Sequence, residues 1–275
     1  MTTIHLLGSG GFIGSAVQRQ AYNLPLHCWS HRSSDHDHHF DLLNPSSWQK
    51  LLSHQPTHVI LLSWPGLPNY QKPFHVTHNL PACIELVERL LAAGLQRLVA
   101  AGTCYEYGLQ NGGLKEDQLT DPANCYAIAK DSLRRVIANR CDEHKVEWCW
   151  LRIFYPYGQG QNPKSLVPSL HKALENGDKV FPMGSGRQLR DFIPVEDVAE
   201  QLLTLATHQD AFGVYNGGTG MPRSVFEMVE EAVVAHGGCI QLKRGARPDR
   251  TDEPLAFWAN MEKLQGLHRS QQIEQ

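Results

Sequence analysis

The chain has 275 residues, of which 41% are hydrophobic and 19% are charged, and its formal net charge is −3. This composition is typical of a folded globular protein, and the small net charge gives no basic field that would attract nucleic acid or an anionic membrane. No stretch approaches the roughly 20 apolar residues that cross a bilayer, and the start lacks the features of a signal peptide, so we expect a cytoplasmic protein.

Strand patterns alternate with helix patterns along the first half of the chain, which predicts a doubly wound, Rossmann-type α/β fold with a parallel sheet over residues 1–155. After residue 155, glycines and prolines cluster between helical patterns. We expect residues 156–275 to form a smaller α/β substrate domain, interleaved with the sheet. The predicted strands are 3–7, 26–29, 58–62, 98–101 and 146–153, and the predicted helices are 12–22, 48–53, 79–93, 126–139, 166–175, 195–207 and 225–235.

The first predicted strand and helix are joined by a glycine-rich loop with the spacing G-x-x-G-x-x-G. A tight turn, a close approach of backbone to pyrophosphate and close helix–strand packing each exclude a Cβ. The helix N-terminus also offers free N–H groups to phosphates. We therefore predict a dinucleotide site, the alternative being a tight turn that binds no ligand. The residues predicted to bind are Gly8, Gly11, Phe12, Ile13 and Gly14.

The end of the second strand bears on the choice of cofactor. A cofactor with a free 2′-hydroxyl usually meets Asp or Glu there, whereas this chain has Ser30, His31 and Arg32. A guanidinium binds phosphate in a bidentate fork, so Arg32 favours NADP(H), although NAD(H) stays open if Arg32 is only a solvated charge.

Histidines and cysteines give no metal prediction. His36, His38 and His39 lie beside Asp35 and Asp37, but neighbouring histidines in a loop rarely hold ligand geometry, so we expect a solvated loop. The seven cysteines are odd in number and include no C-x-x-C pair, which argues against a disulfide framework or a zinc site.

Tyr126 and Lys130 are four residues apart on a predicted helix and share one face. A nearby ammonium is expected to lower the pKa of a tyrosine from its usual value near 10, and Lys130 is also placed to hydrogen-bond a nicotinamide ribose. Thr103 ends an earlier strand and offers a hydroxyl to the same substrate oxygen. Y-x-x-x-K alone is a frequent accident, but the glycine loop, Thr103 and this pair in order predict hydride-transfer chemistry.

These motifs resemble those of the extended short-chain dehydrogenase/reductases, specifically the NAD(P)-dependent nucleotide-sugar epimerase/dehydratase/reductase family. The similarity covers nearly the whole chain and includes residues 8–14, 101–108, 151–154, 157–158 and 184–193, the last followed by Val195, Asp197 and Val198. It implies that Asp41 and Leu42 flank the adenine and that Arg190 and Arg247 contact the nucleotide diphosphate. The alternative for Arg190 is a structural ion pair with Asp191 or Asp197. The resemblance also implies a homodimer through the helices that begin near 79 and 126.

The departures from the family pattern narrow the expected reaction. Relatives that dehydrate sugars at carbons 4 and 6 usually carry Asp-Glu after the catalytic threonine, but Cys104 and Tyr105 stand there in this chain. Many epimerases have Asn where this chain has Tyr155. We predict that Cys104, Tyr105 and Tyr155 contact the substrate, although Cys104 is otherwise a small apolar filler. The short C-terminus is similar to that of the family's 4-ketosugar reductases.

The leading hypothesis is therefore the reduction of a nucleotide-linked 4-keto-6-deoxyhexose, with Thr103, Tyr126 and Lys130 as the catalytic residues and NADPH as the hydride donor. A nucleotide-sugar 4-epimerase with tightly bound NAD is the second hypothesis, since it would use the same residues. A non-catalytic dinucleotide sensor or scaffold on the same fold is a third hypothesis from another class.

Overall fold

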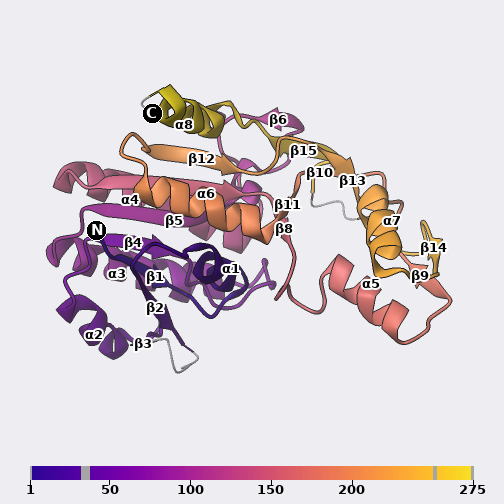
Figure 1. Cartoon of the computed structure of the whole chain (residues 1–275), viewed down its shortest axis with the longest axis horizontal. Coiled ribbons are helices and arrows are strands. Elements are labelled where there is room, and N and C mark those ends of the chain that lie inside the picture. The colour runs from indigo at the N-terminus through magenta and orange to yellow at the C-terminus, as the bar shows by residue number, and fades with distance from the viewer. Residues whose placement is uncertain (1, 32–37, 250–252, 274–275) are drawn as a thin grey trace.

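The computed structural model describes residues 2–31, 38–249 and 253–273. Its centre is a seven-stranded sheet with the order β12-β7-β5-β4-β1-β2-β3 (Figure 1). Every neighbouring pair in this sheet is parallel. The predicted α/β class with a Rossmann-type parallel sheet is confirmed. The strands are β1 (Ile4–Leu7), β2 (Leu26–Ser30), β3 (His38–His39), β4 (His58–Leu61), β5 (Arg97–Thr103), β7 (Glu147–Ile153) and β12 (Gly213–Gly217).

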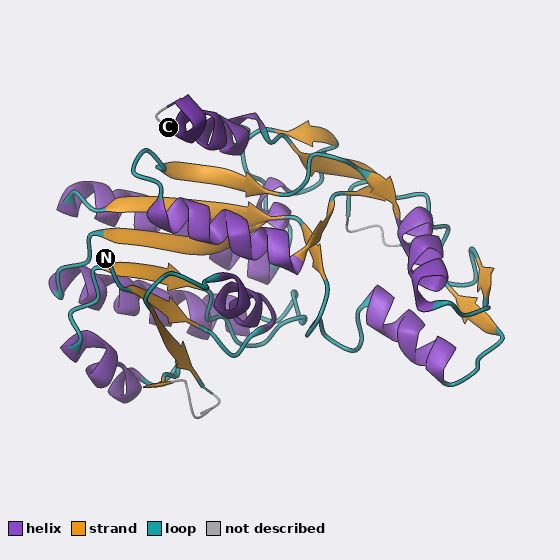
Figure 2. Cartoon of the chain, in the orientation of Figure 1, coloured by secondary structure: helices purple, strands orange, loops and turns teal. Residues whose placement is uncertain are grey.

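Helices cover both faces of the large sheet (Figure 2). Because successive side chains of a strand point to opposite faces, Leu6 packs on one side and Leu7 on the other. The first face is covered by α1 (Phe12–Gln20), α6 (Val195–Thr207) and α8 (Glu262–Ile273). The second face is covered by α2 (Trp48–Ser53), α3 (Leu80–Ala92) and α4 (Cys125–His144). Both faces of the sheet are therefore covered by helices and shielded from water, as is usual for a parallel sheet.

A smaller lobe lies beyond the carboxyl ends of the strands, on the right of Figure 1. Its own core joins α5 (Leu166–Glu175) to α7 (Val225–His236). Three short sheets link or edge the two parts. Their strands are β6 (Gly112–Leu114), β8 (Tyr155–Tyr157), β9 (Val180–Pro182), β10 (Leu189–Arg190), β11 (Phe192–Pro194), β13 (Arg223–Ser224), β14 (Gln241–Lys243) and β15 (Ala256–Ala259).

The chain reverses its direction of winding at β1, which lies between β2 and β4. After β1 the chain builds β2 and β3 on one side and then crosses to build β4, β5 and β7 on the other. The loops that leave β1 and β4 therefore diverge at their carboxyl ends. In open α/β sheets this switch point is where ligands bind.

Local caps explain where the structure departs from the predicted helix bounds. The helix predicted at 126–139 begins at Cys125 because the Asn124 side chain accepts from the Ala127 N–H, and it continues to His144. The helix predicted from 79 begins as an α-helix at Leu80, after a π-helical turn over His75–Asn79. The helices predicted at 48–53, 166–175 and 195–207 have those bounds.

Residues beyond 155 add β12 to the large sheet and cover one of its faces with α6 and α8. They also build the small lobe. The division of the chain into domains at residue 155 stays a prediction. Among the residues that the model describes, no helix is long and apolar enough to cross a membrane.

Candidate active site

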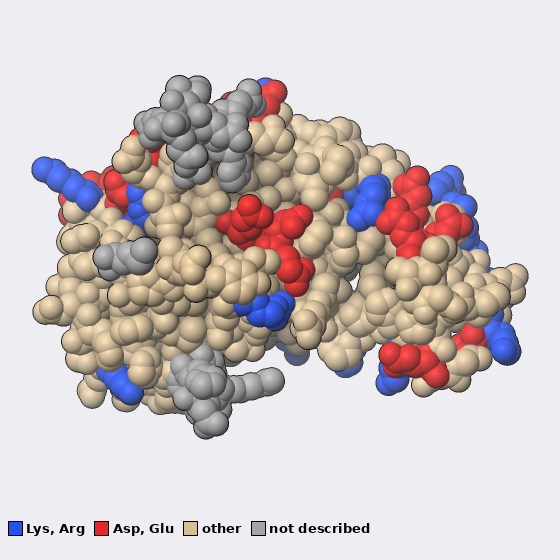
Figure 3. Space-filling model, in the orientation of Figure 1, with Lys and Arg blue, Asp and Glu red and all other residues tan. Residues whose placement is uncertain are grey.

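A cavity of about 1340 Å³ opens at the carboxyl ends of the central strands. Its lining comes from the glycine loop, the ends of β4, β5 and β7, and the small lobe. The space-filling view shows the surface hollowed between the large body and this lobe (Figure 3). The cavity exceeds the roughly 300–1,000 Å³ of an ordinary small-molecule site, so it has room for two ligands end to end.

The glycine loop forms the end of the cavity nearest β1. Gly8 has φ +97°, and a Cβ there would lie 2.8 Å from the backbone nitrogen of Ser63. The N-cap of α1 is Gly11, which makes no side-chain cap, and no acidic residue follows in the first turn. The first N–H groups of α1 therefore face the cavity with no competing side chain, which suits a phosphate. All five predicted loop residues line the cavity.

We expect Gly14→Ala to abolish this cradle. A Cβ at Gly14 would collide with the carbonyl oxygen of Gly8 and lie 2.8 Å from Ser9 Cα, both backbone atoms that cannot rotate away. Dinucleotide affinity should fall at least about tenfold, and overpacking should cost about 1–3 kcal/mol of stability. Fluorescence titration and urea unfolding measure the two effects. Gly266→Ala, where a Cβ meets open space, is the control; equal dinucleotide affinity in the two variants would contradict the prediction.

The opposite end of the dinucleotide region is lined by Ser30, His31, Asp41 and Leu42. Asp41 is held in place because its carboxylate accepts from the Leu43 N–H at 2.9 Å and lies 3.5 Å from His31 Nδ1. The structure thus brings the predicted adenine residues to the glycine loop. Arg32, on which the NADP(H) prediction depends, lies outside the described residues.

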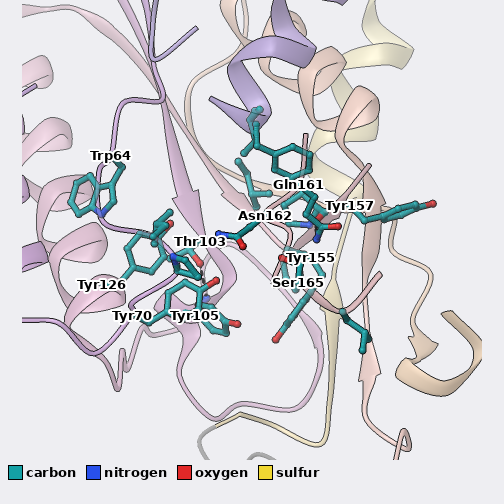
Figure 4. Close-up of a pocket in the computed structure, with 18 of the residues that line it drawn as sticks. Trp64, Tyr70, Thr103, Tyr105, Tyr126, Tyr155, Tyr157, Gln161, Asn162 and Ser165 are labelled. Atoms are coloured by element: carbon teal, nitrogen blue, oxygen red, sulfur yellow. Dashed lines mark hydrogen bonds between the residues drawn. The ribbon is translucent and has the colours of Figure 1, made fainter. Parts of the chain in front are cut away.

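Thr103 and Tyr126 lie side by side in the cavity (Figure 4), and Lys130 lines the same cavity. The Thr103 side chain hydrogen-bonds Tyr126, and the Tyr126 backbone N–H donates to the carbonyl of Tyr70 at 2.9 Å. Lys130 Nζ donates to the Ala101 carbonyl at 2.9 Å and lies 4.0 Å from the centroid of the Trp64 ring. The end of β5 and one face of α4 therefore supply the whole group.

The expected lowering of the tyrosine pKa by Lys130 is not seen in this structure. Burial raises the pKa of Tyr126, because its phenolate would lose water, and the Thr103 hydrogen bond offsets this only in part. Lys130 Nζ is 6.0 Å from the Tyr126 ring centroid and engages a carbonyl instead. Tyr126 is therefore held as a neutral phenol, the form that donates a proton.

Burial lowers the pKa of Lys130 from 10.5 to about 8. The unfolded chain keeps this proton up to about 10.5, so it binds more protons than the folded chain between pH 8 and 10.5. The unfolding free energy of the wild type should therefore rise with pH relative to Lys130→Met, on the order of 3 kcal/mol across that window. Urea unfolding of both proteins at a series of pH values measures this difference. A difference that stays constant with pH would argue that Lys130 is not desolvated.

A buried ion pair fixes the end of β5 beneath Thr103. Glu106 is fully buried and accepts from Arg152 Nε at 2.8 Å, from Trp150 Nε1 at 2.9 Å and from the Thr103 N–H at 2.9 Å. Thr103 caps the following short helix with its hydroxyl, which accepts from the Tyr105 N–H. This capping box orients Thr103 toward Tyr126. It also engages the Glu106 carboxylate, which lies three residues after Thr103.

The predicted substrate residues divide into two groups. Tyr105, Tyr155, Arg190 and Arg247 all line the cavity. Cys104 does not belong to the described lining; it is 2% exposed within the core below α6, and burial raises the pKa of its thiol. For Cys104 the structure favours the apolar-filler alternative, because the helical turn after Thr103 directs this side chain inward.

Arg190 forms an ion pair, but with neither aspartate that the sequence suggested. Its guanidinium lies 3.1 Å from the Glu253 carboxylate and donates from Nε to the Tyr155 hydroxyl at 3.1 Å. Tyr155 in turn donates to Glu253 at 2.9 Å. Asp191 instead accepts from the N–H groups of Thr219 and Gly220. Glu253, Arg190 and Tyr155 thus form one connected polar group on the small-lobe side of the cavity.

Among the further residues that line the cavity, Trp64, Tyr70 and Glu253 were not predicted from the sequence. Trp64 and Tyr70 come from the loop that follows the carboxyl end of β4. The other loops of the site also follow strand ends, so this position in the sequence could have indicated that the two residues line the cavity. Tyr70 and Tyr126 have ring centroids 5.5 Å apart. Glu253 lies in a polar stretch with no periodicity, so only the fold shows its place.

A Rossmann-type sheet with a glycine loop at its switch point and a Thr–Tyr–Lys group at the end of β5 defines a short-chain dehydrogenase/reductase of the extended type. The model of the NAD dependent epimerase/dehydratase family matches residues 4–218, and the chain belongs to that family. Its members include nucleotide-sugar epimerases, dehydratases and dehydrogenases.

Individual relatives show how far the similarity extends. A dTDP-6-deoxy-L-talose 4-dehydrogenase (NAD(+)) from Aggregatibacter actinomycetemcomitans is 26% identical over 201 residues, covering 73% of this chain and 74% of that protein. The match covers about half of several other curated relatives, for example 47% of the mouse dTDP-D-glucose 4,6-dehydratase.

Two solved structures extend the comparison over nearly the whole chain. A UDP-N-acetylglucosamine 4-epimerase from Methanobrevibacter ruminantium M1, in complex with UDP-N-acetylmuramic acid, has a TM-score of 0.85 at 21% identity, covering 97% of this chain and 91% of that one. That identity level shows the fold alone. MoeE5 in complex with UDP-glucose and NAD has a TM-score of 0.80 at 26% identity, with coverage of 97% and 91%.

Proposed function

We propose that the protein reduces a nucleotide-linked 4-keto-6-deoxyhexose by hydride transfer from a nicotinamide cofactor. The observation that carries the proposal is the meeting of Thr103, Tyr126 and Lys130 without an elimination pair behind them. Cys104 points into the core, and the next carboxylate, Glu106, is fully buried against Arg152. The hydride machinery is present, and the positions that supply acid and base for dehydration do not offer a carboxyl group to the cavity.

Each residue of the group has a defined part in this reaction. Thr103 hydrogen-bonds the carbonyl oxygen at carbon 4, and the neutral Tyr126 phenol donates its proton to that oxygen as the alcohol forms. Lys130 binds the nicotinamide ribose, and its ammonium group stabilises the Tyr126 phenolate that remains after the proton has been donated. When bound, the reduced cofactor supplies the hydride to carbon 4 and is itself oxidised.

We propose that Arg190 and Arg247 bind the nucleotide diphosphate, with Arg190 exchanging Glu253 for the ligand. A guanidinium group suits phosphate oxygens, and the Glu253 carboxylate competes with them for Arg190. Glu253→Gln should therefore lower the KM for the nucleotide sugar severalfold and leave kcat near its wild-type value. Steady-state kinetics measure both constants, with Glu262→Gln on the surface as the control. An unchanged KM would favour a purely structural role for Arg190.

We propose a preference for NADP(H) from the residues at the end of β2. Ser30 and His31 stand where an NAD-binding protein usually has an Asp or Glu for the ribose 2′-hydroxyl, and neither carries a carboxylate. The name of the talose dehydrogenase and the MoeE5 complex both specify NAD, which keeps NAD(H) as the alternative. Titration of the apo protein with NADPH and NADH decides between them. Arg32→Ala should weaken NADPH binding and spare NADH; equal effects on both cofactors would refute the role of Arg32.

The talose relative supports the reaction class, since its name describes oxidation at carbon 4 of a 6-deoxysugar, the reverse of the proposed reduction. The test supplies purified protein with reduced cofactor and a panel of nucleotide-linked 4-ketosugars, and follows loss of the reduced nicotinamide absorbance. Oxidation with a 4-keto-6-deoxy substrate is the expected result. No oxidation with any member of the panel would overturn the proposal.

A 4-epimerase is the second candidate, because the same Thr–Tyr–Lys group serves a transient oxidation. It would come first if denaturation of the purified protein released stoichiometric NAD, and if the native protein interconverted 4-epimers without added cofactor. Within one chain, α3 and α4 pack side by side and are joined by the Arg140–Glu88 ion pair. We also propose that these two helices form the interface of a homodimer. Light scattering of the purified protein tests this.

A further inference from the structure

Four histidines from separate segments gather near the edge of the large sheet where β1, β2, β3 and the end of α2 meet; Figure 1 shows these elements. They are His5 in β1, His27 in β2, His38 in β3 and His54 at the C-cap of α2. One ring nitrogen from each of His27, His38 and His54 lies within 4.8 Å of the other two. The ring centroids of these three are 5.5–6.0 Å apart.

The strand registers build this cluster. His5 is paired with His27 across β1 and β2, and His38 is paired with Trp29 across β2 and β3. His27 and Trp29 are two residues apart, so their side chains share one face of the sheet. Trp29 is fully buried and contacts His38 at a centroid distance of 4.6 Å, so it forms the floor beneath the imidazoles.

The hydrogen bond of His54 leaves one of its ring nitrogens able to bind a metal. His54 Nδ1 lies 2.7 Å from the Lys50 carbonyl, which only accepts, so Nδ1 carries the proton and Nε2 keeps its lone pair. His27 Nδ1 is buried and has no hydrogen-bond partner among the described residues. Buried polar atoms are rarely left in that state. Histidine ligands usually donate their other ring N–H to a carbonyl, as His54 does.

We propose that His27, His38 and His54 bind a divalent transition metal, with zinc as the best fit. Two nitrogens on a tetrahedral zinc lie about 3.3 Å apart when each bond is about 2.0 Å, so small side-chain rotations bring the three rings to the metal. His54 is exposed, which gives the ion access and leaves a fourth position for water. His5 is excluded as a ligand through Nδ1, because that atom accepts from Trp29 Nε1 at 3.1 Å.

This site differs from the cluster of His36, His38 and His39 that was considered from the sequence. Of the neighbouring histidines, His39 is exposed on the other side of β3 and His36 lies outside the described residues. The ligands come instead from three segments that only the fold brings together. A metal here would tie β3 to α2, and residues 38–42 continue from β3 to Asp41 and Leu42 in the dinucleotide cavity.

The experiment uses tag-free protein and Co²⁺ as the probe, with Zn²⁺ as competitor. Bound Co²⁺ should give visible ligand-field absorption bands that saturate at one equivalent of Co²⁺ per chain, and Zn²⁺ should displace the Co²⁺. His54→Gln and His38→Gln should each weaken binding at least about tenfold. His39→Gln, the next residue of the same strand, is the matched control and should bind as the wild type does. Circular dichroism checks that each variant is folded.

A second readout separates this site from scattered surface binding. Zn²⁺ should raise the Tm of the wild type and of His39→Gln by a few degrees, and should leave that of His54→Gln unchanged. The proposal is overturned if Co²⁺ gives no saturable bands, or if all three variants bind it as the wild type does. It is equally overturned if His39→Gln loses as much affinity as His54→Gln. None of these outcomes depends on the proposed sugar reaction.

Discussion

Tyr126→Phe is expected to lower turnover by about a hundredfold to ten-thousandfold while dinucleotide affinity stays near the wild-type value. The substitution removes only the phenol oxygen, which the structure places at the cavity beside Thr103 with its proton retained by burial. Without that proton the alkoxide formed at carbon 4 has no partner. The lost hydrogen bond to Thr103 should cost only about 1 kcal/mol of stability, so the variant should fold.

The measurement pairs single-turnover kinetics with a cofactor titration of the same sample. Tyr22→Phe makes the same chemical change on a tyrosine that is 83% exposed, and should change neither quantity. This pair of variants also separates an enzyme from a dinucleotide sensor. A sensor would lose nothing at Tyr126, and an active Tyr126→Phe enzyme would mean that another group donates the proton.

Glu106→Gln should lower the free energy of unfolding by about 3–5 kcal/mol, the largest stability effect that we expect at a single position. Three donors converge on this fully buried carboxylate, and one of them is the Arg152 guanidinium. An amide presents its own N–H group to at least one of these donors and leaves the buried positive charge uncompensated. Because the Thr103 N–H is among the donors, kcat should fall as well.

Urea unfolding of three variants tests this account. Glu85→Gln removes an exposed carboxylate paired with Arg89 within one helix and should cost less than about 0.5 kcal/mol. The double variant Glu106→Gln, Arg152→Met should recover part of the loss, because it removes the stranded charge. A loss below about 1 kcal/mol for Glu106→Gln would mean that water or a shifted Arg152 replaces the ion pair.

Several parts of this protein depend only on local spacing and were predicted from the sequence. Alternating strands and helices predicted the parallel sheet, and the structure has helices at 48–53, 166–175 and 195–207 as predicted. The glycine loop and the Tyr126–Lys130 pair were predicted because a βα turn and a helix face each bring nearby residues together. For the same reason the sequence placed Thr103 at a strand end, where parallel strands present their loops to one edge.

Features that depend on partners far apart in the chain could not be predicted from residue spacing. The partner of Arg190 is Glu253, 63 residues away, and no local pattern distinguishes it from nearby acids. The state of Tyr126 is set by burial, which a helix-face argument does not include, and so the expected lowering of its pKa is not seen. Cys104 points to the core because the turn after Thr103 is closed by a capping box, and His27, His38 and His54 meet only through strand pairing. Residue spacing along the chain determines short-range geometry, whereas burial and charge pairing depend on which surfaces the folded chain brings into contact.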